Sequence, residues 1–456
     1  MYIINEINEI IWLLVVGMLV LSAIWYTIRL KFFQFRMIPQ MLRVMFQKPK
    51  DGNIGSFQAF AVALSSRVGT GNLAGVASAI FVGGPGAVLW MWLMALFGSA
   101  TAFVESTLAQ LYKRKGEDSY YGGPAYYMES GLGMRWMGVI FAVLITLTFA
   151  LANQVVQSTT LCDSVSSTFT LSKPMVGVAM TLATFVIIFG GVRRISHFAS
   201  MVVPFMAVGY ILLALYIVIM NITDVPDVVG LILEDALGLR QVAGGGVGVA
   251  VMQGIRRGLF SNEAGEGSAP NAAAIADTPH PVNQGLLQAL GVFVDTLIIC
   301  TCTAFIIIIS GKYDCGKDGI LLTAEALEAE VGSFGRYFIT ATIFLFAFST
   351  IIANYFYGET NVRFFTKKKW VLLTLRLLTG VVVMAGSLVD LQTAFSLVDI
   401  CMAFMTITNL IAIGALFPKV VVLLENYKRQ LRQHTAPEFH KNDLDEDDRQ
   451  NIECWD

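Results

Sequence analysis

Long apolar stretches separated by short polar segments recur along the whole chain. A bilayer core needs about 20 apolar residues for one helical span. We place eleven candidate spans, at 9–28, 57–83, 87–112, 136–160, 174–191, 198–221, 243–276, 285–311, 337–357, 370–389 and 392–417. The pattern predicts an all-α polytopic membrane protein with about 11 transmembrane helices.

The composition supports the same class. Of the 456 residues, 55% are hydrophobic and 14% are charged, whereas soluble chains carry roughly 25% charged residues. This excludes a soluble multidomain enzyme. The net charge of −2 and the lack of a basic stripe with interleaved aromatics argue against nucleic acid as a partner. The expected partners are membrane lipid and a small molecule, and the sequence implies no oligomer.

Lys and Arg residues are distributed unevenly between alternate connecting segments. With the N-terminus outside, the inner segments hold 22 of them and the outer segments hold five. Positive residues favour the cytoplasmic side, so we expect the N-terminus outside and the C-terminus inside the cell membrane. The tail beyond Pro418 is polar and contains the acidic run DLDEDD at 443–448. Its composition predicts a solvated or disordered segment.

Two apolar stretches are interrupted by glycine and polar residues. The first interruption is SSRVGTGN at 65–72, and the second is GLFSNEAGEGS at 258–268. Backbone groups cannot stay unsatisfied in hydrocarbon, so each break must be buried in protein or line a watery cavity. Half-helix ends at a break attract a carboxylate on one side and a cation on the other. Two such ends suit an amino acid and sodium.

A single break could arise without any binding site. GTGNLAG at 69–75 opens like a dinucleotide-binding turn, but its spacing is G-x-G-x-x-x-G and no strand precedes it. Close packing of helices through small residues is the stronger alternative.

Two breaks favour a transporter, because each opens a block of five spans. An odd number of spans per block inverts the second block relative to the first, as in inverted-repeat transporters with a midplane site. The expected parts are an extra N-terminal helix and inner loop at 1–56, a first repeat at 57–221, a second repeat at 243–418 and a polar cytoplasmic tail at 419–456.

The broken segments resemble those of the alanine/glycine:cation symporters, also called sodium:alanine symporters. The resemblance rests on SSRVGTGNLAGVASAIFVGGPGAVLWMW (65–92), GGPAYYMESGLG (122–133), GLFSNEAGEGSAPNAAAIADTPHPVNQG (258–285) and, more loosely, STIIANYFYGE (349–359). It implies a five-plus-five inverted-repeat core of the neurotransmitter:sodium symporter type. It also implies a bacterial importer of small neutral amino acids that moves Na⁺, or sometimes H⁺, and needs no organic cofactor.

The resemblance further implies site residues, position by position. The amino-acid site would be lined by residues of both breaks: Thr70, Gly71, Asn72, Phe260, Ser261 and Asn262. One Na⁺ would lie between the first and eighth core helices, on the carbonyls or hydroxyls of Ser65, Val68, Ser349 and Thr350. The two hydroxyls on the eighth helix have an alternative, which is to bond back to their own helix.

The third core helix would supply a side wall. Gln154 and Gln157 share one face of it, and such a face either lines a cavity or bonds a neighbouring helix. The sequence leaves open which glutamine reaches the ligand.

The chain departs from the family at Ala353-Asn354, where members commonly have Gly-Trp. The loss of an indole enlarges the pocket and adds an amide. We therefore expect a larger polar amino acid, such as glutamine, to be accepted beside or instead of alanine.

Charges inside the spans must pair, line water or snorkel. Arg256 and Arg257 precede the second break on its outer side, where they would form an external gate or steer the substrate carboxylate. The alternative is structural ion pairing with Glu263 or Glu266. The sequence leaves open the roles of three further acids: Glu105, Asp295 and Asp399.

The expected function is sodium-coupled symport of a small neutral amino acid, of the alanine/glycine class or glutamine, by alternating access. One alternative is proton coupling, which needs a titratable group such as Asp295. The other is a channel or receptor on the same helices. We expect no enzyme, because none of the four histidines lies in an expected core cavity.

Overall fold

The chain is built almost entirely of helices. A computed structural model describes residues 2–47, 49, 53–116, 119–239, 246–449 and 451–455. The helices before residue 240 are α1 (Tyr2–Arg29), α2 (Phe33–Arg36), α3 (Ile38–Met45), α4 (Ser56–Arg67), α5 (Val76–Gly83), α6 (Ala87–Leu111), α7 (Pro124–Leu132), α8 (Arg135–Ile145), α9 (Asn153–Phe169), α10 (Lys173–Ile188), α11 (Gly191–Met220) and α12 (Val225–Ala236).

The second half continues in the same way. Its helices are α13 (Gly246–Asn262), α14 (Ala269–Ala273), α15 (Pro281–Val292), α16 (Thr301–Ile309), α17 (Gly319–Val331), α18 (Ser333–Phe365), α19 (Lys369–Gly386), α20 (Leu391–Arg432) and α21 (Glu446–Arg449). Three π-helical segments and one 3₁₀ turn complete them: η1 (Gly71–Gly75), η2 (Thr146–Ala152), η3 (Phe293–Cys300) and η4 (Lys441–Asp443). One short antiparallel pair, β1 (Arg114–Lys115) and β2 (Tyr120–Tyr121), places Arg114 opposite Tyr121.

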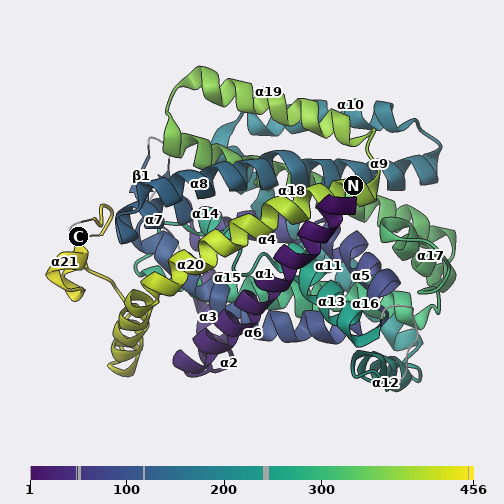
Figure 1. The fold of residues 1–456 in the computed structure, drawn as a ribbon, viewed down its shortest axis with the longest axis horizontal. Coiled ribbons are helices and arrows are strands. Elements are labelled where there is room, and N and C mark those ends of the chain that lie inside the picture. Colours follow the sequence, from purple (N-terminus) through teal and green to yellow (C-terminus); the bar gives the residue numbers. More distant parts are fainter. Residues whose placement is uncertain are drawn as a thin grey trace.

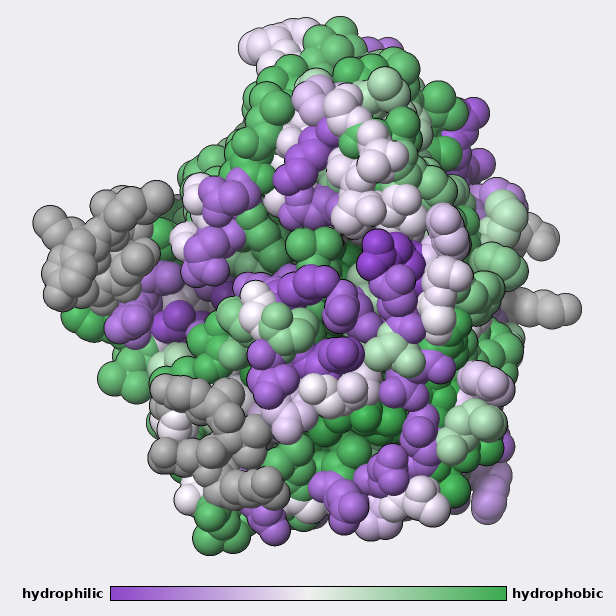
Figure 2. Space-filling model, turned by 90° about the vertical axis from the view of Figure 1, so that its right-hand side faces the viewer, coloured by the Kyte–Doolittle hydropathy of each residue, from purple (hydrophilic) through white to green (hydrophobic). Residues whose placement is uncertain are grey.

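The polytopic class is confirmed. In the described ranges, eight helices are long and apolar enough to cross a membrane, and Gly71–Gly83 and Lys173–Ile188 are shorter apolar helices. α12 and α17 lie at one end of the bundle, and α7, β1 and α21 lie at the other (Figure 1). Figure 2 views the α12 and α17 end, where polar residues gather over the middle of the face and hydrophobic residues dominate its flanks. Large apolar side chains such as Phe205 and Leu212 on α11 are exposed, which fits contact with lipid.

Both predicted interruptions are present. α4 ends at Arg67 and helical structure resumes at Gly71, while α13 ends at Asn262 and α14 begins at Ala269. In the second break Gly265 and Gly267 have φ of +95° and +88°. These left-handed angles suit glycine, because it lacks the Cβ that makes them costly for other residues. The glycines thus let the chain leave the helix within the bundle.

Packing brings the broken helices to the centre of the bundle. α18 contacts α4, α9 and α11, while α6 contacts α13, α14 and α15. At the top of Figure 1, α10 and α19 lie side by side at the edge of the bundle, away from the breaks. The core is therefore formed around α4 to α6, α13 to α15 and α18.

The C-terminal segment differs from the expectation. α20 continues through Pro418 to Arg432, and beyond it Phe439, Ile452 and Trp455 are buried. The Trp455 indole donates to the Gln110 carbonyl at 3.1 Å, and the Phe439 amide donates to the Pro279 carbonyl at 2.9 Å. Disorder is wrong for the described residues of this segment, whereas most of those beyond Arg432 are exposed, as expected of a solvated segment. An averaged composition hides a few apolar side chains that anchor an otherwise polar segment.

Candidate functional site

The two breaks approach each other closely in the centre of the bundle. A Cβ added at Gly71 would lie 3.0 Å from the Ser261 Cα and 3.2 Å from the Phe260 ring. Only glycine allows this approach without displacing the second break. The structure therefore brings together the residues that the resemblance assigned to an amino-acid site.

Asp295 joins the two breaks through its carboxylate. Asn72 Nδ2 donates to its Oδ1 at 2.6 Å, and Ser261 Oγ donates to its Oδ2 at 2.8 Å. Thr296 Oγ1 adds a third bond at 2.9 Å and itself accepts from Asn262 Nδ2 at 3.1 Å. Asp295 is fully buried, so its three donors replace water around a charge at membrane depth. The sequence placed Asp295 inside a span but could not connect it to the breaks.

Gln157, and not Gln154, contacts the first break. The Thr70 amide donates to Gln157 Oε1 at 3.3 Å, and Gln157 Nε2 donates to Asn153 Oδ1 at 2.9 Å. Gln154 Nε2 instead donates to the Ile351 carbonyl of α18 at 3.0 Å. Each glutamine therefore bonds a neighbouring segment, which is one of the two alternatives for this polar face. The Thr70 hydroxyl is buried and has no hydrogen-bond partner in the described structure, which leaves it available to a ligand.

The oxygens assigned to sodium are only partly gathered. Thr350 Oγ1 donates to the Ser65 carbonyl at 2.8 Å, so α18 meets the end of α4 directly. Ser349 Oγ bonds back to the Phe346 carbonyl at 2.9 Å, which is the alternative expected for such hydroxyls. Val68 is buried beside them at the end of α4, its amide bonded to the Leu64 carbonyl at 2.7 Å. Ser65 and Thr350 thus form the tightest pair in this set.

Asn354 of α18 lies beside the end of α4, at the first break. Ser66 Oγ is 3.0 Å from Asn354 Oδ1 and also donates to Glu263 in the second break. The Asn354 amide nitrogen is buried without a partner in the described structure. Asn354 therefore belongs to a buried polar cluster with Ser66 and Glu263, which we call the floor of the breaks.

Buried acids hold this floor together. Ser268 Oγ lies 2.6 Å from Glu263 Oε2 and 3.1 Å from Glu266 Oε1. Glu105 of α6 accepts from the Gly265 amide at 3.2 Å and from Asn409 of α20 at 2.8 Å. The second break is thereby tied to α6 and α20.

On the side of the breaks that the distribution of Lys and Arg predicts to be external, an ion pair joins α13 to α20. Arg257 Nη2 lies 2.6 Å from Asp399 Oδ2, and both side chains are at most 7% exposed. The guanidinium also lies 4.3 Å from the Phe395 ring centroid, and Phe395 packs edge-on against Phe260 of the second break. The alternative of pairing with Glu263 or Glu266 is wrong for Arg257. Its partner comes from α20, 142 residues away in sequence, which no local pattern could indicate.

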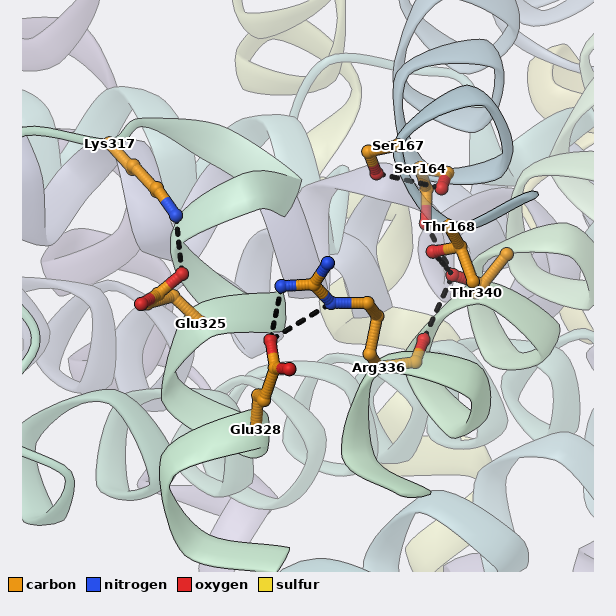
Figure 3. A network of polar contacts seen from close by, with 8 residues as sticks. All are labelled: Ser164, Ser167, Thr168, Lys317, Glu325, Glu328, Arg336 and Thr340. Carbon is orange, nitrogen blue, oxygen red and sulfur yellow. Dashed lines mark hydrogen bonds and ion pairs between the residues drawn. The ribbon is translucent and has the colours of Figure 1, made fainter. Parts of the chain in front are cut away.

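Helix α17 packs against η1 in the first break. Thr323 Oγ1 donates to the Leu73 carbonyl in η1 at 2.9 Å. Ion pairs of Lys317 with Glu325 and of Arg336 with Glu328 hold the helix in place (Figure 3). Close to them, Thr340 bonds Ser164 and Thr168 at 3.1 and 2.8 Å, which fixes the start of α18 against α9. The sequence placed 312–336 between spans and predicted no covering helix there.

The arrangement has the chemistry of an occluded binding site. Half-helix ends, neutral oxygens and the buried carboxylates of Asp295 and Glu263 meet where the two breaks approach each other. Groups of this kind suit a small zwitterion and a cation.

Comparison with known proteins agrees with this description. A profile of the sodium:alanine symporter family matches residues 1–441. The probable sodium/glutamine symporter GlnT of Bacillus subtilis is 46% identical over 100% of this chain and 96% of its own length. The putative sodium/proton-dependent alanine carrier protein YrbD of the same organism is 41% identical over 95% and 94%.

Among solved structures, a Na⁺-coupled sialic acid symporter aligns with a TM-score of 0.53 at 13% identity, covering 89% of this chain and 86% of that one. That likeness concerns the fold alone. The match of nearly the whole sequence and the two broken helices lead to one conclusion: the chain is a multi-pass protein of the cell membrane that belongs to the sodium:alanine symporter family of amino-acid:cation symporters.

Proposed function

We propose that the protein imports a small neutral amino acid together with Na⁺ by alternating access. The observation that carries the proposal is the position of Asp295, whose carboxylate bonds Asn72 of one break and Ser261 of the other. A carboxylate between two half-helices favours positive charge around both breaks, both the ammonium group of the amino acid and a cation bound nearby. Each ligand then raises the affinity of the other by the same factor, which is the thermodynamic basis of symport.

The substrate carboxylate would face the start of η1 at Gly71, where the half-helix presents its positive end. The ammonium group would face the end of α13, near the backbone of Phe260 and Ser261. Gln157 and Thr70 would form the side wall. In this arrangement Asn262 positions Thr296, and through it the carboxylate of Asp295.

Sodium would bind between α4 and α18. The Ser65 carbonyl and the Thr350 hydroxyl are already in contact, and Na⁺ entering there would exchange their hydrogen bond for two oxygen ligands. The Val68 carbonyl would complete the site, and Ser349 would join it after its hydroxyl turns away from Phe346.

The proposed architecture is a five-plus-five inverted repeat over 57–221 and 243–418, with α1 as the extra helix and eleven spans in all. Its support is that each expected repeat begins with one broken helix. The positive residues favour an outer N-terminus and an inner C-terminus. Arg257 and Asp399 would then act as the outer gate, with Arg256 beside them.

Glutamine is the larger substrate that we propose beside alanine. The support is the similarity to GlnT and the amide of Asn354, which replaces the tryptophan common in the family. A second candidate is proton coupling, favoured by the buried acids Glu263 and Glu266 that share the single hydroxyl of Ser268.

The test is uptake of radiolabelled alanine and glutamine into proteoliposomes with an inward Na⁺ gradient, a choline control and a pH gradient. We expect accumulation with Na⁺ only, and its loss in Asp295→Asn. Asp314→Asn, an exposed acid in an outer loop, serves as the matched control. Accumulation driven by the pH gradient alone would move the coupling to H⁺, and no accumulation under either gradient would overturn the substrate assignment.

A further inference from the structure

The N-terminal helix α1 reaches the outer gate through one residue, Trp12. Its side chain is fully buried. Its indole Nε1 donates to the backbone carbonyl of Asp399 at 3.1 Å. Asp399 is the residue whose carboxylate pairs with Arg257. The hydrogen bond therefore fixes the backbone that presents one half of the gate.

The same indole also contacts the helix that carries the other half. The Arg256 guanidinium lies 5.1 Å from the Trp12 ring centroid, within the range of a cation–π contact. Trp12 thus bonds α20 through its N–H and α13 through its ring. An indole is the only side chain that offers both a buried donor and this strongest of aromatic faces.

We propose that Trp12 is a positioning residue of the outer gate. Through Trp12, helix α1 contributes to the transport cycle by stabilising the closed gate. The proposal rests on the proposed function, because it gives the Arg257–Asp399 pair the role of a gate. Trp12 itself touches neither the amino acid nor the cation. It acts by holding α13 and α20 together while the gate is closed.

The Arg257–Asp399 pair needs the contacts of Trp12 because several polar atoms of the gate residues lack hydrogen-bond partners in the described structure. Asp399 Oδ1, Arg257 Nη1 and Arg256 Nε are buried atoms without hydrogen-bond partners in the described structure. A buried ion pair stabilises only when its geometry is good and its remaining polar atoms are satisfied. The single Arg257–Asp399 contact therefore depends on how well neighbouring groups orient the two helices.

The remainder of α1 provides a matched control. Trp25 lies on the same helix but is 56% exposed on its outward side. Trp12→Phe keeps an aromatic ring and removes the donor, while Trp25→Phe makes the same chemical change away from the gate. Any general effect of losing an indole from α1 would appear in both variants.

Accessibility of the path below the gate is the direct readout. Ala403 is fully buried and lies one helical turn inward from Asp399 on the same face of α20. A cysteine placed there, in a background without Cys300, Cys302, Cys315 and Cys401, reacts with a membrane-impermeant thiol reagent from outside only when the gate opens. We expect Trp12→Phe to raise the reaction rate about fivefold, the factor that corresponds to one ordinary hydrogen bond, and Trp25→Phe to leave it unchanged.

A double-mutant cycle separates positioning from a merely structural role. If Trp12 acts through the gate pair, Trp12→Phe adds no further rate increase to Asp399→Asn. Full additivity, or equal rates in wild type and Trp12→Phe, would overturn the proposal. If Trp12→Phe does not fold, Arg256→Gln removes the contact from the other side and should give an increase of similar size.

The labelling assay needs no transported substrate, so it is independent of the transport assignment. A wild type that accumulates no amino acid, together with faster labelling in Trp12→Phe, would retain the positioning role and reject the proposed function. A wild type that transports, together with equal labelling in all variants, would retain the proposed function and reject the positioning role of Trp12.

Discussion

Asn72 and Asp295 are joined by a 2.6 Å hydrogen bond although 223 residues separate them in the sequence. Asn72 also accepts a bond from the Gly69 amide at 2.9 Å through its side-chain oxygen. One amide side chain thus stabilises the irregular backbone of the first break and links it to the carboxylate that holds the second. The shape of the site and its charge depend on the same residue.

Gly71→Ala should strongly reduce transport. The added Cβ would lie 3.0 Å from the Ser261 Cα. The backbone of Ser261 can make room for it only if the two breaks separate. Overpacking of this kind costs about 1–3 kcal/mol, so we expect initial uptake to fall at least about fivefold. Gly209→Ala on α11 is the matched control, because a Cβ there meets nothing within 4 Å. Equal uptake by Gly71→Ala and wild type would show that the breaks do not form the site.

Thr350→Val should weaken sodium dependence more than Ser349→Ala does. Thr350 bonds across to the Ser65 carbonyl, while Ser349 bonds within its own helix. We expect the Na⁺ concentration for half-maximal uptake to rise roughly five- to tenfold in Thr350→Val, the effect of losing one polar contact of about 1 kcal/mol or slightly more. Ser349→Ala should change it less than twofold. The reverse order would place the cation elsewhere.

Asn354→Trp should change substrate preference. The side chain is fully buried against Ser66, and an indole there fills space that a long substrate would use. We expect uptake of glutamine to fall about tenfold or more relative to alanine, since steric rejection is worth about 1–3 kcal/mol per group. Competition between the two labelled substrates measures the ratio. The double variant Ala353→Gly/Asn354→Trp restores the Gly-Trp pair of the family and controls for a clash between the new indole and Ala353. An unchanged ratio of glutamine to alanine uptake in both variants would show that Asn354 does not determine the substrate preference.

Acidification should loosen the C-terminal segment. His280, just before α15, packs against the rings of Tyr427 and Phe439 and lies 3.4 Å from Asn426 Oδ1. Burial lowers the pKa of His280 from 6.5 to about 3, so the packed state holds a neutral ring. Below pH 6.5 only the unpacked state takes up the proton. The packing is therefore undiminished above pH 6.5 and is weakened by about 2 kcal/mol at pH 5.

Hydrogen exchange at the Phe439 amide, corrected for its intrinsic pH dependence, measures this effect. That amide is bonded to the Pro279 carbonyl when the segment is packed. His280→Asn, which cannot titrate, should show no extra exchange between pH 7 and pH 5. The same pH response in both proteins would assign the loosening to another group.

The sequence predicted the parts of the fold that have a local signature. Glycine and polar residues within apolar runs identified both breaks, because such residues are costly at membrane depth unless the chain there is buried or lines a cavity. The pairing of Arg257 with Asp399 and the bridge from Asp295 could not be predicted, since each depends on helices that meet only after folding. Gln157 and Gln154 share a helix face, and only their surroundings decide which one contacts the break. The few buried side chains that anchor the C-terminal segment were missed because they are invisible in an average over polar residues.

The three π-helical segments lie where the polar site residues are found: Asn72 is in η1, Asn153 directly follows η2, and Asp295 is in η3. A π turn holds one more residue than an α turn. Removing one residue from such a segment can restore an α turn and keep the rest of the helix facing the same neighbours. Elsewhere a one-residue deletion would rotate everything beyond it by about 100°. Among relatives of this chain, single-residue insertions and deletions within the membrane helices should therefore cluster at these three segments, and each such change should alter the binding site while the surrounding bundle stays intact.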